Sequence, residues 1–232
     1  MDLADALAAR GLDWIVPQWP APARVAAFFT TRQGDAADLR ALVPADPVWL
    51  SQVHGRDVAI VDEANAAALR ATPPRADAAV TRASGIPVAI RTADCLPVLL
   101  CDRAGSVLAV AHAGWRGLAA GVLEATLDAM DVPPANVVAW IGPAIGPRAF
   151  EVGADVHEAF CATDPGAAFH FVAHREGKWL ADLPALARRR LAARGVPDIA
   201  GGPWCTVTDS ERFFSWRRDK ATGRMALAAW LW

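Results

Sequence analysis

Two adjacent apolar segments, Leu96–Cys101 and Val107–His112, place the tightest constraint on how this chain can fold. The turn-forming residues Asp102–Gly105 lie between them, so the two segments are predicted to pair as a β-hairpin. Alternate residues of a strand point to opposite faces, and the first strand is apolar on both. A sheet that is hydrophobic on both faces must be covered on both. The hairpin therefore predicts one α/β domain built of several layers.

The register of this hairpin brings two reactive side chains together. If Asp102–Gly105 form its loop, Cys101 pairs with Ser106 and Cys95 lies opposite His112. Directly opposed residues have Cβ atoms about 4.5–5.5 Å apart, close enough to share a metal ion or to form a thiolate–imidazole pair. A bulge in the loop would shift this register by one residue and separate the two side chains.

Further strands and helices are predicted along the chain from apolar periodicity and turn residues. The other predicted strands are Val25–Thr31, Val48–Val53, Val58–Val61, Ala78–Thr81, Val88–Thr92, Val137–Ile141 and Met225–Trp230. The predicted helices follow Gly117 (LAAGVLEATLDAM), lie near Asp155–Phe160, and span Leu183–Ala193 with Asp182 as N-cap.

Composition and organisation are those expected of a globular protein. Of the 232 residues, 54% are hydrophobic and 21% are charged, with a net charge of −2. Residues 1–24 are expected to form an N-terminal extension with a Pro-rich connector, and residues 25–232 a single catalytic domain. The near-neutral charge gives no case for binding nucleic acid or an anionic membrane. The four scattered cysteines are expected to be reduced thiols.

Two sequence observations bear on the location of the protein. The first residues, MDLADALAARGLDW, lack the basic and apolar regions of a secretory signal. No apolar run approaches the roughly 18 residues needed to span a bilayer. We expect a cytoplasmic monomer or homodimer.

Three residues form a candidate metal site. His54 lies in the turn QVHG, where a strand ends, and it joins the predicted pair Cys95 and His112. Two imidazoles and one thiolate leave a fourth coordination position open, as in a catalytic zinc site. Taken singly, the same residues fit a turn histidine, a buried core thiol and a core histidine.

Two further segments could bind an anion. In AHAGWRG, a strand enters a turn and a helix is predicted to start at or just after Gly117, so backbone N–H groups and Arg116 could hold phosphate. The alternative is that the glycines only satisfy backbone angles and Arg116 is solvated. In the C-terminal run, Arg217, Arg218 and nearby cations beside aromatic residues form either a solvated surface or an anion- or ribose-binding wall.

The blocks QVHG, RADAAVT, TADCLPVLL, AHAGWRG, WIGPAIGPRAFEVG and FFSWRRDKATGRMA, in this order, closely resemble one family. It is the "laccase domain" or multicopper polyphenol oxidase-like family, now usually described as purine nucleoside phosphorylases and related to peptidoglycan-editing factors. The resemblance runs from about Ala27 to the C-terminus. It implies a four-layer α-β-β-α sandwich with mixed sheets. It also implies zinc bound by the catalytic residues His54, Cys95 and His112.

The implied activity is phosphorolysis of adenosine, inosine, guanosine and methylthioadenosine, with deamination of adenosine as a second activity. The expected partners are therefore a purine nucleoside and phosphate. The candidate residues for binding them are Arg32, Gln52, Asp94, Arg116, Arg217 and Arg218. The position of Asp94 beside Cys95 also makes it a candidate general acid. The chain departs from the family in a short segment at residues 30–42 and in Trp216, where tyrosine is common.

Other functions use the same residues differently. One alternative is a metal-free hydrolase or deamidase, like the distantly similar catalytic domain of cytotoxic necrotizing factors. In such an enzyme Cys95 is the nucleophile and His112 is its base. Its substrate would be a cell-wall precursor or another amide. In a copper-dependent polyphenol oxidase the same three residues hold copper. The sequence lacks the additional His-rich motifs that the further coppers of a laccase require.

Overall fold

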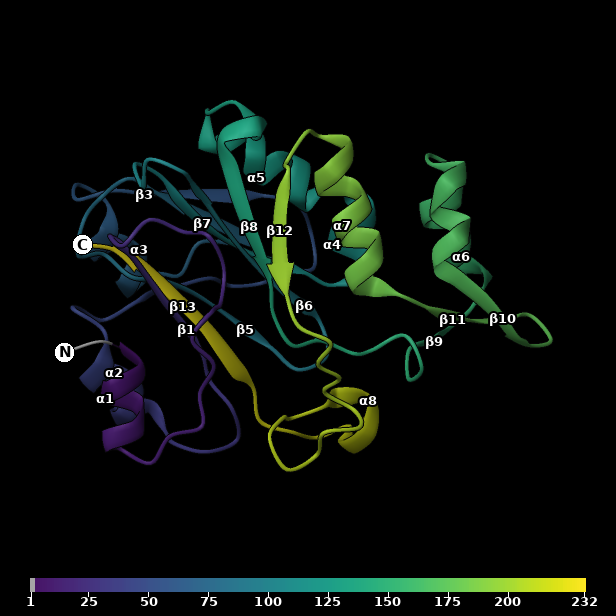
Figure 1. Ribbon diagram of the computed structural model, residues 1–232, viewed down its shortest axis with the longest axis horizontal. Helices are drawn as coiled ribbons and strands as arrows, with labels where there is room; N and C mark the ends of the chain where they lie inside the picture. Colours follow the sequence, from purple (N-terminus) through teal and green to yellow (C-terminus); the bar gives the residue numbers. More distant parts are fainter. Residues whose placement is uncertain (1–2) are drawn as a thin grey trace.

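The computed structural model describes residues 3–232 and shows four layers, with two β-sheets packed face to face between helices (Figure 1). Helices α4, α5 and α7 cover one outer face, and α1 and α2 cover the other. The implied α-β-β-α sandwich is confirmed.

The α-helices are α1 Leu3–Ala9, α2 Ala36–Leu42, α3 Ala66–Ala71, α4 Trp115–Ala120, α5 Val122–Met130, α6 Ala154–Cys161, α7 Leu183–Ala193 and α8 Trp216–Asp219. Two 3-10 helices complete the helical elements, η1 Pro134–Asn136 and η2 Pro165–His170.

Both large sheets are mixed. The four-stranded sheet has the order β1 (Val25–Phe29), β13 (Met225–Leu231), β5 (Val88–Thr92), β2 (Val48–Trp49), with only the β2–β5 pair parallel. The six-stranded sheet has the order β12 (Asp198–Gly201), β8 (Val137–Ile141), β6 (Leu96–Asp102), β7 (Leu108–Ala113), β4 (Ala78–Thr81), β3 (Val58–Val61). Its end pairs are parallel and its central pairs antiparallel.

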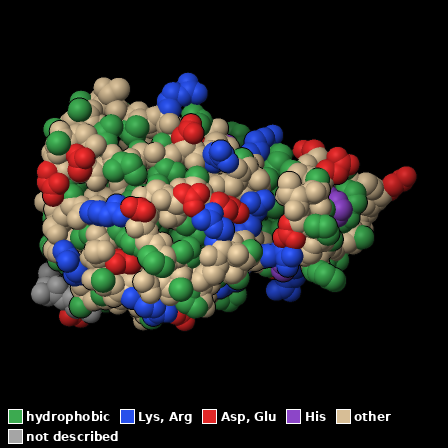
Figure 2. Space-filling model, turned by 90° about the horizontal axis from the view of Figure 1, so that it is seen from above, with side chains coloured by type: hydrophobic (Ala, Val, Ile, Leu, Met, Phe, Trp, Pro, Cys, Tyr) green, Lys and Arg blue, Asp and Glu red, His purple; other side chains and the backbone are tan. Residues whose placement is uncertain are grey.

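A small third sheet lies beside the sandwich. Its order is β10 (Phe171–Arg175), β11 (Lys178–Ala181), β9 (Glu151–Val152). With α6 it forms a lobe that projects from the body on the right of Figures 1 and 2. Acidic and basic side chains are interspersed over the face shown in Figure 2. No helix among residues 3–232 has the length and apolar character needed to cross a bilayer.

Strand β6 explains why the fold needs so many layers. All of its residues are buried. Leu96, Val98 and Leu100 pack under the helices, while Leu99 and Cys101 pack between the two sheets. Burying such a leucine stabilises the fold by about 1.5–3 kcal/mol, so each face of the sheet requires a cover.

The first residues of the chain supply part of the outer layer. Leu7 and Trp14 are buried against Phe28 and Trp230 on the outer face of the four-stranded sheet. Ile15 also bridges to the backbone of Phe29 in β1. This segment is therefore packed onto the sheet beside the strand that follows it.

The hairpin forms, but its predicted register is wrong by two residues. Cys101 pairs with Leu108, so Pro97 lies opposite His112 and Cys95 precedes the strand. The cause is Asp102, whose carboxylate accepts hydrogen bonds from the backbone N–H groups of the next turn and so closes a longer loop. A shift of two residues keeps the alternation of faces, so the interior of the sandwich is unchanged.

The predicted strand Val48–Val53 ends earlier, at Trp49. Beyond it, the Gln52 side-chain amide takes the place of a backbone partner for Arg91. Its Nε2 donates to the Arg91 carbonyl at 2.8 Å and its Oε1 accepts from the Arg91 N–H at 2.8 Å. The predicted strand Val25–Thr31 similarly ends at Phe29.

The helix predicted at or after Gly117 begins two residues earlier, at Trp115, with Gly114 as its N-cap. The helical run is also divided at Gly121, which has φ 94° and separates α4 from α5. In contrast, the prediction for Leu183–Ala193 is confirmed. The Asp182 carboxylate caps that helix by accepting a hydrogen bond from the Ala185 N–H at 2.9 Å.

Replacing Asp102 tests the loop that sets the register. Its carboxylate accepts hydrogen bonds from Ser106 N (2.6 Å), Val107 N (3.0 Å) and Ser106 Oγ (2.7 Å). We expect Asp102→Ala to lower the free energy of unfolding by about 1–3 kcal/mol, because it leaves the buried N–H of Val107 and two partly buried donors of Ser106 without their acceptor. Urea denaturation at neutral pH measures the loss, and Asp102→Asn, which keeps one acceptor oxygen, should lose less.

The stabilisation that Asp102 provides should depend on pH, and the lowered pKa of its carboxyl sets the direction of that dependence. Burial opposes ionisation of Asp102, but its hydrogen bonds outweigh burial and hold its pKa below the ordinary value. Its contribution is therefore complete above the ordinary carboxyl pKa and is lost as the pH falls through the lowered one. A difference between wild type and Asp102→Ala that grows on acidification would contradict this account.

Candidate metal centre and its pocket

His54, Cys95 and His112 converge at one end of the sandwich. His54 lies in the turn after β2, Cys95 immediately before β6, and His112 near the end of β7. One ligand atom from each lies within 4.8 Å of the others. The two imidazole rings meet edge to face, with centroids 4.9 Å apart and an interplanar angle of 77°. The structure thus brings together the three residues that the sequence singled out, although not through the predicted register.

Asp77, at the start of β4, organises this cluster and is completely buried. Its carboxylate accepts hydrogen bonds from the backbone N–H groups of Val53 (3.1 Å), His54 (3.0 Å) and Gly55 (2.7 Å). It also bonds the Nδ1 of His112 at 2.8 Å. One buried carboxylate therefore fixes the turn that carries His54 and leaves the Nε2 of His112 free for a ligand.

Cys95 lies in an environment that favours its thiolate. Burial opposes ionisation, but hydrogen bonds from His112 and His54 outweigh it and lower the Cys95 pKa to about 6. Burial also works against a charge on His112, but the bond to Asp77 and the nearby Cys95 raise its pKa to about 9. The side chains therefore favour an anionic sulfur beside an imidazolium in the metal-free protein.

The space around the sulfur suits a metal ion. Gly114 faces the cluster, and a Cβ at this position would lie 2.9 Å from Cys95 Sγ and 3.2 Å from His54 Cδ2. Gly114 has φ −59°, which any residue adopts, so the room beside the ligands is what requires glycine here. One thiolate and two imidazoles form a donor set that zinc or copper binds. Geometry and chemistry therefore fit a metal held by His54, Cys95 and His112.

The cluster opens into a cavity of about 560 Å³. Its apolar wall consists of Leu50, Trp115, Ile145, Phe150, Leu183 and Trp216. Its polar wall, besides the metal-site residues, includes Gln52, Arg91, Asp94, Arg217 and Arg224. Three of these residues are aromatic, and their rings facing a few polar groups suit a flat, polar ligand such as a heteroaromatic ring.

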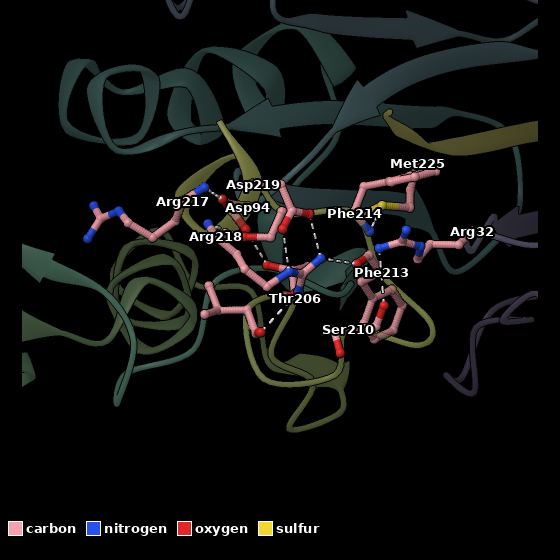
Figure 3. Close-up of polar contacts among 12 residues, drawn as sticks. Arg32, Asp94, Thr206, Ser210, Phe213, Phe214, Arg217, Arg218, Asp219 and Met225 are labelled. Atoms are coloured by element: carbon pink, nitrogen blue, oxygen red, sulfur yellow. Dashed lines mark hydrogen bonds and ion pairs between the residues drawn. The ribbon is translucent and has the colours of Figure 1, made fainter. Parts of the chain in front are cut away.

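Three of the candidate binding residues lie outside this cavity. Arg32 donates to the Ser210 carbonyl at 3.2 Å and lies over the Phe214 ring (Figure 3). Arg116 is exposed on α4 and lies over the ring of Trp115.

Arg218 is the third, and its guanidinium is fully engaged in holding its own loop. It donates to the backbone carbonyls of Thr206, Val207 and Phe213 and to the Asp219 carboxylate (Figure 3). Arg217 behaves differently, since Figure 3 shows its side chain pointing away from this group of contacts.

Asp94 lines the cavity, and the contacts of its carboxylate tie the C-terminal segment to the sheet. One oxygen accepts from the Thr206 hydroxyl at 2.5 Å and the other from the Arg217 N–H at 2.6 Å (Figure 3). Asp94 itself has φ 88°, a left-handed conformation that is unusual for a side-chain-bearing residue. With both oxygens accepting hydrogen bonds, its geometry suits positioning better than proton donation.

Sequence reasoning missed Asp77 and Arg91. Asp77 stands directly before the buried strand Ala78–Thr81, in a block that contributed only to the family resemblance. An acidic residue directly before a short, mostly apolar strand was an available signal, because a buried carboxylate requires several hydrogen-bond donors. Nothing local in the sequence marks Arg91.

The comparisons with known proteins agree with this picture. The family model for multi-copper polyphenol oxidoreductase laccase matches residues 27–232. The purine nucleoside phosphorylase YfiH of Escherichia coli (strain K12) is 49% identical, over 94% of this chain and 98% of that protein. The purine nucleoside phosphorylase PA4543 of Pseudomonas aeruginosa is 46% identical with the same coverage. The crystal structure of Neisseria meningitidis protein NMB0706 has a TM-score of 0.88 and 44% identity, covering 94% of this chain and 99% of that one.

Asp77→Asn tests whether the buried carboxylate supports metal binding. We expect the variant to bind zinc about 10–100-fold more weakly, because the neutral amide orients His112 less firmly and presents fewer acceptors to the His54 turn. Competition against a chromogenic chelator measures the affinity. The matched control is Asp57→Asn, which removes an exposed carboxylate from the same loop. Equal zinc affinity of Asp77→Asn and wild type would exclude the supporting role.

Proposed function

The chain belongs to the multi-copper polyphenol oxidoreductase laccase family, and on that premise we propose that it is a zinc-dependent purine nucleoside phosphorylase. The observation that carries the proposal is a His–Cys–His cluster inside a cavity with an aromatic wall. The names of the relatives that align with nearly the whole chain support it. The proposed substrates are adenosine, inosine, guanosine and methylthioadenosine, with phosphate as the second substrate.

Zinc held by His54, Cys95 and His112 would supply a Lewis acid and lower the pKa of a water at its open position toward about 7. The protein's own residues supply the rest of the site. Asp77 holds His112 in one orientation through Nδ1. Trp115, Phe150 and Trp216 offer faces on which a purine can stack.

In phosphorolysis, an oxygen of phosphate forms a bond to ribose C1′ while the bond from C1′ to the purine nitrogen breaks. The bonding electrons leave with the base, which then takes up a proton. The cavity provides cationic groups for the phosphate and a half-enclosed space that limits competing water. Deamination of adenosine, in which water replaces the amino group at C6, is the proposed second activity. We propose that the enzyme works in the cytoplasm as a monomer or homodimer.

A cysteine hydrolase or deamidase is a second candidate, and one observation favours it. Cys95, His112 and Asp77 stand in the order of nucleophile, base and orienting carboxylate, with the last two joined at 2.8 Å. A copper oxidase has weaker support. Among residues 3–232 the His54 cluster is the one group of this kind, whereas a laccase needs several coppers.

A product assay on metal-quantified protein tests the proposed function. Adenosine and inosine are incubated with and without phosphate, and the bases and ribose 1-phosphate are measured. We expect free base and ribose 1-phosphate only when phosphate is present, and a loss of activity of at least about 100-fold in Cys95→Ala because a metal ligand is removed. Inosine formed from adenosine would show the deaminase activity.

The control for this assay is Cys161→Ala, which removes a thiol on α6 that does not line the cavity. It should keep full activity and zinc content. Absence of turnover by fully zinc-loaded wild type would exclude the phosphorylase and favour the hydrolase.

The ionisation of the Cys95 thiol can be tested in metal-free protein by alkylation with iodoacetamide. Because the Cys95 pKa is lowered to about 6, its alkylation rate should rise with pH and level off above about pH 7. Cys101 should stay unreactive in this range, since burial raises its pKa to about 12. Mass spectrometry of the alkylated peptides separates the two sites. An alkylation midpoint for Cys95 near the ordinary thiol pKa would contradict the described environment.

A further inference from the structure

We propose that Arg91, Arg217 and Arg224 form an anion subsite at the rim of the cavity, and that its occupant is the phosphate dianion used in the reaction. This assignment rests on the proposed function. The three residues line the same cavity as the metal cluster, and Arg91 also borders a neighbouring cavity beside Trp49. They come from two parts of the chain, since Arg217 and Arg224 lie in one C-terminal segment, and Arg91 belongs to none of the motifs that suggested the activity.

The sheet register places two of these arginines side by side. In the antiparallel pair β5–β13, Arg91 lies opposite Ala226, and Arg224 comes directly before β13, two residues ahead of Ala226. Arg91 and Arg224 are therefore near each other at the same end of this strand pair. Long side chains at such positions can reach one ion between them.

All three cations rest on aromatic rings. Arg91 lies 3.8 Å from the ring centroid of Trp49, Arg217 5.5 Å from that of Phe150, and Arg224 5.6 Å from that of Trp216. These contacts restrict the guanidinium planes without neutralising their charge.

Their charges also lack carboxylate partners. Across residues 3–232, no Asp or Glu forms an ion pair with any of the three. Asp94 is the one carboxylate that lines the cavity, and both of its oxygens already accept hydrogen bonds. The rim is therefore a place where positive charge exceeds negative charge before any ligand binds.

The arginines also keep most of their donors. Arg217 donates from one terminal nitrogen to the Glu151 carbonyl at 2.9 Å, and Arg224 uses one terminal nitrogen for the carbonyls of Thr222 and Gly223. Each guanidinium has five N–H donors. Arg218, in contrast, is committed to backbone carbonyls and Asp219. Free, forked donors on unneutralised cations match the oxygens of a phosphate dianion.

Phosphate binding is measured directly, without nucleoside, by titrating the zinc-loaded protein with inorganic phosphate in a calorimeter at constant ionic strength. The variants are Arg91→Gln, Arg224→Gln and the double variant. Arg103→Gln is the matched control, because Arg103 lies in the loop at the opposite end of the β6–β7 hairpin. Zinc content and melting temperature show whether each variant is folded.

We expect each single variant to bind phosphate at least about tenfold more weakly, the loss typical of one charge-assisted hydrogen bond, and Arg103→Gln to match wild type. In turnover, the KM for phosphate should rise by a similar factor while the KM for inosine stays constant, a split that a merely structural role would not produce. Unchanged phosphate affinity in the double variant, or an equal loss in Arg103→Gln, would overturn the subsite.

The outcomes separate this proposal from the proposed function. Arginine-dependent phosphate binding without nucleoside cleavage would keep the subsite and exclude the phosphorylase. Phosphorolysis with an unchanged phosphate KM in the double variant would keep the phosphorylase and exclude the subsite. The phosphoryl group of a nucleotide offers the same chemistry, so adenosine 5′-monophosphate is titrated in parallel. Arginine-dependent binding of this nucleotide with no binding of inorganic phosphate would overturn the assignment of the co-substrate.

Discussion

The carboxylate of Asp77 is the contact on which the candidate site depends. It is buried and accepts three backbone hydrogen bonds from the His54 turn and a fourth contact from His112. A buried charge of this kind is stable only when its acceptor sites are filled, so each donor must stay in place. The turn after one sheet and the last residues of a strand in the other are thereby fixed to a common point.

Much of the fold was predictable because apolar periodicity carries it. The hairpin, the strand Val137–Ile141 and the helix Leu183–Ala193 were predicted from pattern alone, and the layering followed from the apolar faces of β6. Two of the errors arose where a side chain replaced a backbone partner. Asp102 closed the hairpin loop, and Gln52 substituted for a strand residue opposite Arg91. Such substitutions leave no trace in hydrophobic periodicity.

Less of the candidate site than of the fold could be predicted from the sequence. Reactive residues at strand ends can be found in a sequence, so His54, Cys95 and His112 were identified. Groups that act through position alone cannot be found in this way. The space beside Gly114 and the nearness of Arg91 to Arg224 exist only once the strands are paired. Arg218 illustrates the opposite error, because it lies in a cationic run but uses its donors on its own loop.

The conformation of His54 bears on the choice between a metal enzyme and a cysteine hydrolase. His54 has φ 61°, a left-handed conformation that costs a non-glycine residue of order 1–3 kcal/mol. The hydrogen bonds from its turn to Asp77 offset that cost and hold the imidazole edge against His112. A nucleophilic Cys95 needs a base and an orienting carboxylate, which His112 and Asp77 supply, and a hydrogen bond from His54 further lowers the Cys95 pKa. A catalytic zinc ion needs three protein ligands, so His54 is required in the metal site but only auxiliary in the hydrolase. This difference favours the zinc-dependent function.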